Sequence, residues 1–74
     1  MSETIKFLTE FRKRVDAFVG AVVEVEKYEN AKKEEKDEII LKAFDIMMER
    51  KLKDARTAWM DCQELEHKFL SRFD

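Results

Sequence analysis

The sequence has no proline, one glycine and one cysteine, and each shortage excludes a class of structure. With glycine only at position 20, the chain has almost none of the residues that mark turns. One cysteine cannot form an internal disulfide, which argues against a small secreted disulfide scaffold. We therefore expect long regular elements, in a protein of a reducing compartment that we take to be the cytoplasm.

Long apolar runs and a strong excess of one charge are missing as well. No run approaches the roughly 18 residues that a membrane span needs, and the stretch 17–25 is interrupted by Glu24. The first residues lack the basic and apolar regions of a signal peptide, so we expect no leader. Fifteen Lys and Arg face seventeen Asp and Glu, for a net charge of −2. The short apolar runs argue against a membrane partner, and the charge balance argues against a nucleic-acid partner.

The residues that are present predict helices throughout. Lys, Glu, Ala, Leu, Met and Arg dominate, and no segment alternates in the manner of a strand. A chain of 74 residues and 8.9 kDa allows a single domain, 1–74. We expect a helix over about 4–29, a charged turn over about 30–36, and one helix or two over about 37–73. Ser2 or Thr4 is expected to cap the first helix and Asp37 the second.

Apolar residues at alternating spacings of three and four predict one seam on each helix. The phase is kept across 37–73, which favours one long helix there, while a break near 50–54 would give three helices in all. The predicted core seam is Leu8, Phe11, Val15, Phe18, Val22 and Val25 in the first helix, and Leu41, Phe44, Met48, Leu52, Ala55, Trp59, Cys62, Phe69 and Phe73 in the second region.

A second apolar stripe, formed by Ile39, Ala43, Ile46 and Met60, lies on the other face of the second region. Two helices of one chain cannot cover both stripes. We therefore predict an all-α fold, a long helical hairpin that pairs with a second copy into a four-helix bundle. A compact three-helix monomer is the alternative, and a third hypothesis is that the stripe binds a different protein.

Few residues suggest chemistry. Cys62 and the single histidine, His67, fall on different helix faces, so they do not form a nucleophile and its base, and Cys62 is expected in the core. Glu64 and His67 form the Glu-x-x-His pair found in carboxylate-bridged di-iron bundles, so a metal-binding hairpin is one alternative function. A second alternative function is that of a small nucleic-acid-associated protein. It is suggested by a basic cluster that consists of Arg50, Lys51, Lys53 and Arg56.

These observations predict a non-enzymatic protein–protein interaction module without a cofactor. We expect a small accessory regulator or inhibitor, a homodimer, that presents the stripe of Ile39, Ala43, Ile46 and Met60 to a partner protein. Its length and type fit a small phage-encoded inhibitor of a host protein.

Overall fold

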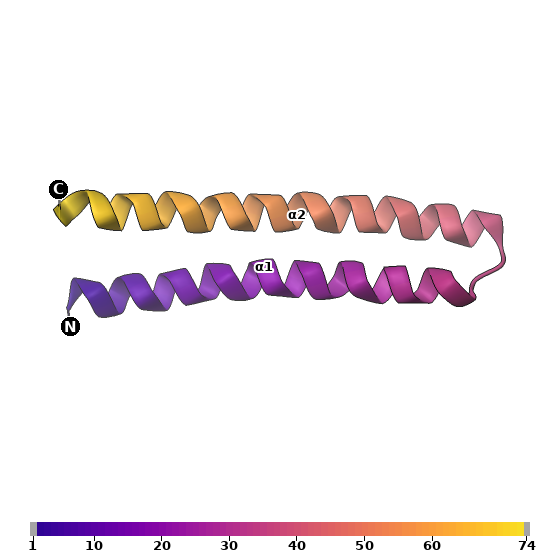
Figure 1. Cartoon of the computed structure of the whole chain (residues 1–74), viewed down its shortest axis with the longest axis horizontal. Helices are drawn as coiled ribbons and strands as arrows, with labels where there is room; N and C mark the ends of the chain where they lie inside the picture. The colour runs from indigo at the N-terminus through magenta and orange to yellow at the C-terminus, as the bar shows by residue number, and fades with distance from the viewer. Residues whose placement is uncertain (1, 74) are drawn as a thin grey trace.

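The computed structural model describes residues 2–73, which form two long antiparallel helices lying side by side (Figure 1). Helix α1 spans Glu3–Glu34 and helix α2 spans Glu38–Leu70, and a single 3₁₀ turn, η1, follows at Ser71–Phe73. The Cα trace is 54 Å long, 18 Å wide and 12 Å thick. The predicted all-helical hairpin is confirmed. Helix α2 passes through residues 50–54 without a break, so the chain has two long helices and not three.

Side-chain caps begin both helices, as the sequence predicts. The hydroxyl of Ser2 accepts a hydrogen bond from the backbone N–H of Ile5 at 3.2 Å. The carboxylate of Asp37 accepts one from the N–H of Ile39 at 2.8 Å. Each cap satisfies a backbone donor that has no partner inside its helix.

The turn is shorter than predicted, because α1 continues to Glu34 instead of ending at residue 29. Its last turn is tied to α2 by Lys32, whose ammonium donates to the Asp45 carboxylate at 2.6 Å. Only residues 35–37 connect the helices. The side chain of Glu35 accepts from the N–H groups of Lys36 and Asp37 at 3.1 and 3.0 Å, so this loop closes without glycine or proline.

Residues that face the other helix repeat at spacings of three and four along both helices, as in an antiparallel coiled coil. We call these residues the inner seam. It consists of Phe7, Phe11, Arg14, Phe18, Ala21, Val25, Tyr28 and Lys32 in α1, and Leu41, Phe44, Met48, Lys51, Ala55, Ala58, Cys62, Leu65 and Phe69 in α2.

Stacked aromatic rings set the register of the two helices. The rings of Phe7 and Phe69 lie 4.1 Å apart between their centroids. Because the helices are antiparallel, steps of seven residues from this pair bring Ala21 of α1 to the level of Ala55 of α2. The same steps bring Arg14 to the level of Cys62.

The predicted core seam and the inner seam overlap only in part. Nine predicted residues lie in the inner seam, namely Phe11, Phe18, Val25, Leu41, Phe44, Met48, Ala55, Cys62 and Phe69. Val15 and Val22 are half-buried beside it, whereas Leu8, Leu52 and Trp59 expose half of their surface or more. The side chain of Phe73 lies outside the described residues.

The interior of the hairpin is small. Among the described residues only Ala21, Ala55 and Cys62 are buried, with 8%, 5% and 3% of their surface exposed. A Cβ added at Gly20 would meet no atom within 4 Å, so no close helix approach inside the hairpin explains this glycine. Two helices alone therefore leave much apolar surface uncovered.

Candidate interaction surfaces

One broad side of the hairpin carries a continuous set of apolar side chains, which we call the apolar lateral face. Val15 follows Phe11 by four residues and precedes Phe18 by three, so it lies directly beside that row of the inner seam. The rings of Phe18 and Trp59 lie 5.4 Å apart, which places Trp59 of α2 on the same side. The apolar lateral face consists of Leu8, Val15, Val19, Val22, Leu52 and Trp59.

These side chains are poorly covered by the hairpin itself. Trp59 exposes 50% of its surface and Val19 exposes 49%. Leu8 and Leu52 are exposed to a similar extent, and Ile5 adds a further exposed side chain towards the N-terminus of α1. Contiguous exposed apolar surfaces of this kind are uncommon on monomeric proteins and are typical of sites of protein contact.

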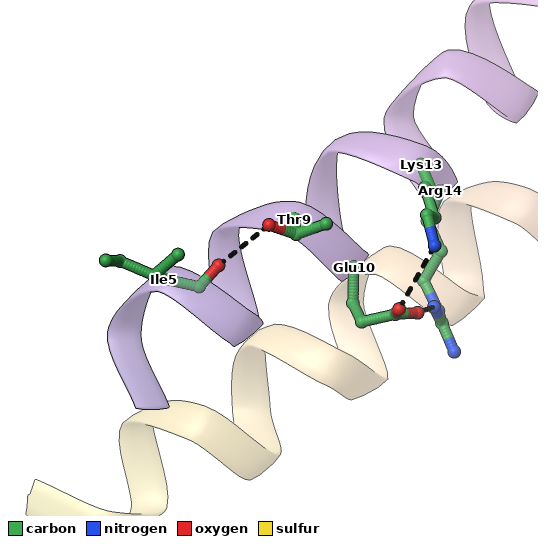
Figure 2. A network of polar contacts seen from close by, with 5 residues as sticks. All are labelled: Ile5, Thr9, Glu10, Lys13 and Arg14. Carbon is green, nitrogen blue, oxygen red and sulfur yellow. Dashed lines mark hydrogen bonds and ion pairs between the residues drawn. The ribbon is translucent and has the colours of Figure 1, made fainter. Parts of the chain in front are cut away.

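The opposite broad side is charged. Glu10 accepts hydrogen bonds from the Arg14 guanidinium at 3.1 Å and from the Lys13 ammonium at 3.5 Å (Figure 2). The hydrogen bond from Arg14, followed by the charge of Lys13, lowers the pKa of the Glu10 carboxyl below its ordinary value. Further carboxylates lie along this side, at Glu24, Asp54 and Asp61.

A shallow cleft of about 380 Å³ opens on the charged side near the chain termini. Its lining includes the stacked rings of Phe7 and Phe69, and charges of both signs surround them. Arg72 forms an ion pair with Glu3 across its mouth. The cleft is open and shows no convergent set of buried polar groups.

A second apolar surface lies on α2 next to the loop. Ile39, Ile40, Ala43, Ile46 and Met47 are all exposed, and we call them the loop patch. Ile39 exposes 79% of its surface, more than any other large apolar residue that the structure describes. The patch occupies the first turns of α2, where the Asp37 cap fixes the helix start.

The structure brings together three of the four residues predicted for the partner-binding stripe. Ile39, Ala43 and Ile46 lie within the loop patch. Met60 is exposed as well, but it lies about 21 Å beyond Ile46 along the helix at 1.5 Å per residue. The intervening positions on that face are Arg50, Lys53 and Thr57, which are polar. Ile40 and Met47 are not part of the predicted stripe, because they lie on a different helical row. The only sequence signal for their exposure beside it is that they belong to the mostly apolar stretch 39–48.

The structure separates Cys62, considered as a nucleophile, from the possible metal pair of Glu64 and His67. Cys62 is buried in the inner seam, whereas Glu64 and His67 are exposed on the outer side of α2. Glu64 forms an ion pair with Lys68 at 3.3 Å. Within residues 2–73, no cluster of three or more His, Cys, Asp or Glu residues could hold a metal ion.

The basic cluster is mostly solvent-exposed. Arg50, Lys53 and Arg56 are exposed, and Lys53 pairs with Glu49 of the same helix at 3.8 Å. Lys51 lies in the inner seam. Neither α1 nor α2, as far as the structure describes them, contains an apolar stretch that could cross a membrane.

Comparison with protein-family models, with curated proteins and with solved structures finds no match to the chain.

Proposed function

We propose that the chain is a non-enzymatic protein-interaction module, a small accessory regulator or inhibitor that inserts one face of α2 into a partner protein. The observation that carries this proposal is the loop patch, five apolar side chains exposed together on the first turns of a helix. Leaving them in water costs free energy that burial against a partner would recover, at about 25 cal/mol per Å² of apolar surface.

The spacing of the loop patch supports a particular mode of binding. Ile39, Ala43 and Ile46 stand at relative positions 0, 4 and 7, which is the pattern of anchors on a helix that lies in an apolar groove. Charged residues border these anchors, among them Lys42 and Asp45. The partner would therefore offer an apolar groove with polar edges, and the helix would enter it already folded.

Self-association is the second part of the proposed function. The hairpin has only three buried residues among those described, and the apolar lateral face is distinct from the loop patch. A four-helix bundle of two copies would supply the larger core that one hairpin lacks.

Binding to the partner can be tested by comparing three purified chains. Proteins retained by the immobilised wild-type chain would be purified and titrated against the wild type, Ile46→Asp and Met60→Asp. We expect Ile46→Asp to weaken binding by about tenfold or more, because it places a charge in the centre of the groove. Met60→Asp is the control, since Met60 is equally apolar and exposed but lies outside the loop patch. Equal weakening by both variants, or by neither, would argue against the loop patch as the binding site.

A further inference from the structure

The hairpin exposes more surface than a folded monomer of its size. Its accessible surface is 6202 Å². A compact monomer of 8.9 kDa exposes about 4,800 Å² according to the scaling of surface with mass. The excess is about 1,400 Å², and a standard protein interface buries about 800 Å² on each partner. One chain therefore has enough surplus surface for a stable interface with a second.

The broad side that contains the apolar lateral face is large enough for such an interface. The plane of the two helices measures 54 by 18 Å between Cα atoms, which gives each broad side about 1,000 Å², more than the share of one partner in a standard interface. The apolar lateral face is part of this side, since Leu8 and Val22 lie about 21 Å apart along α1 at 1.5 Å per residue. The other broad side carries Glu10, Glu24, Asp54 and Asp61, whose burial against a second copy would cost free energy. The apolar side also carries the carboxylates of Asp45 and Glu66, but they lie beyond Leu52 and Trp59 towards its ends, so the middle of this side is the better surface for self-association.

The charges along α1 indicate how a second copy is oriented. Val19 lies near the middle of α1, with Arg12 seven residues before it and Glu26 seven residues after it on the same helical row. Arg12 and Glu26 are exposed, and within residues 2–73 neither of them forms an ion pair in the hairpin. A twofold axis at Val19 would bring Arg12 of each chain beside Glu26 of the other, and Val15 beside Val22.

We propose that a second copy of this chain packs against the apolar lateral face about a twofold axis at Val19, forming a four-helix bundle with the two loops at opposite ends. The inference rests on the proposed interaction function, and it names the partner of one of the two apolar surfaces. Helix α1 packs on α1 of the second copy, and α2 on α2. Because Val19 is near the middle of α1, the hairpins overlap along almost their whole length.

The same arrangement suits α2. In the register defined by Phe7 and Phe69, Val19 is level with Thr57, so the axis passes α2 at Thr57. Leu52 of each chain then lies about 4.5 Å along the helix from Trp59 of the other, at 1.5 Å per residue, which brings these exposed apolar side chains within reach of each other in the core. Towards each end of the bundle the carboxylates of Asp45 and Glu66 from different chains approach each other, and the ammonium of Lys32, which pairs with Asp45 at 2.6 Å, offsets part of their repulsion. The loop patch lies on the outside of α2 and on the charged side, since Ile40 and Met47 share the helical row of Asp54 and Asp61, so it stays accessible to a different partner.

Dimer formation through the apolar lateral face is tested by measuring the molar mass of the purified full chain, by light scattering over a wide range of concentrations. We expect a mass of twice 8.9 kDa for the wild type and 8.9 kDa for Val19→Lys, with helix content by circular dichroism unchanged. Met47→Lys is the matched control, because Met47 is apolar and similarly exposed but lies on the loop patch, and it should remain a dimer. A wild type that stays a monomer, or a dimer lost in Met47→Lys and kept in Val19→Lys, overturns the proposal.

The orientation is tested by exchanging charges, which leaves the apolar core intact. Arg12→Glu alone and Glu26→Arg alone should each raise the dimer dissociation constant by about tenfold, because each reverses an attraction at two symmetric places. The double variant Arg12→Glu/Glu26→Arg should restore the wild-type value. Absence of this rescue overturns the antiparallel arrangement. None of these measurements involves the partner of the loop patch, so failure of the dimer and failure of Ile46-dependent binding are separate results.

Discussion

Small side chains occupy the centre of the inner seam and allow the two helices to pack there. Ala21 and Ala55 stand at the same level, and both are almost fully buried. Larger side chains meet closer to the ends of the hairpin, where the rings of Tyr28 and Phe44 lie 5.8 Å apart near the loop. The hairpin therefore depends on alanine at positions where most apolar residues would force the helices apart.

Replacing one of these alanines by a larger residue should destabilise the hairpin. Ala55→Leu adds three carbons where only 5% of the alanine surface is exposed, and overpacking of this kind costs about 1–3 kcal/mol. Ala43→Leu is the control on the same helix, because Ala43 is exposed and leucine there has room. The free energy of unfolding, measured by urea titration, should fall for the first variant and change by less than about 0.5 kcal/mol for the second. An equal fall in both would show that the centre of the seam is not tightly packed.

At the scale of the elements, the sequence predicts the helices better than the faces that they bury. The caps at Ser2 and Asp37 are found where their side-chain chemistry predicts them. The predicted end of α1 at residue 29 is too early, because the apolar repeat stops there while the helix continues to Glu34. Within these extra residues Lys32 pairs with Asp45 of α2 at 2.6 Å, a contact between distant parts of the chain that no local pattern reveals.

The inner seam could not be deduced because the apolar stripe of α1 is wider than one helix–helix contact. The predicted stripe includes Phe11 and Phe18, which face α2, and also Leu8, which is exposed beside them. Three polar residues, Arg14, Lys32 and Lys51, take places in the seam that the pattern leaves empty. Their long aliphatic stems can cover the seam while the charges reach its edge. A stripe centred between two contact surfaces is typical of a helix in a four-helix bundle.

The Lys32–Asp45 pair predicts how the loop end of the hairpin responds to alkaline pH. The hydrogen bond to Asp45, followed by the attraction of its charge, raises the pKa of Lys32 above its ordinary value of 10.5. A raised pKa in the folded state stabilises folding at pH values below 10.5, and this contribution is lost as pH rises through the folded-state pKa. The difference in free energy of unfolding between the wild type and Lys32→Gln should therefore be constant below pH 10.5. It should shrink as the pH rises from 10.5 through the folded-state pKa of Lys32.

The control for this pH dependence is the same comparison in an Asp45→Asn background. Without the carboxylate, the hydrogen bond to a charged acceptor is lost and Lys32→Gln should have no alkaline dependence beyond that of the background. Urea unfolding at a fixed protein concentration and a series of pH values gives both differences. A decline of equal size in the two backgrounds would assign the effect to other groups.

At the scale of the whole molecule, the hairpin is extended rather than compact. Its radius of gyration is 16.9 Å, against about 11 Å for a compact domain of 74 residues. An extended pair of helices has much surface and little interior, so association is the way for such a chain to gain a core. In the proposed bundle the two loop patches lie at opposite ends, so each dimer could bind two partner molecules, one at each loop.

The single tryptophan reports directly on whether the bundle forms. In the isolated hairpin Trp59 exposes 50% of its surface, and in the proposed bundle it is buried against Leu52 of the second copy. We expect the emission maximum of Trp59 to move to longer wavelength on dilution, with the same midpoint as the loss of dimer mass. Val19→Lys should show the long-wavelength emission at every concentration while keeping its helix content, whereas Met47→Lys should follow the wild type. Emission that is independent of concentration in a protein whose mass doubles would place the interface elsewhere, because Trp59 lies on the apolar lateral face, two residues from the level of the proposed axis, and cannot stay in water if that face is covered.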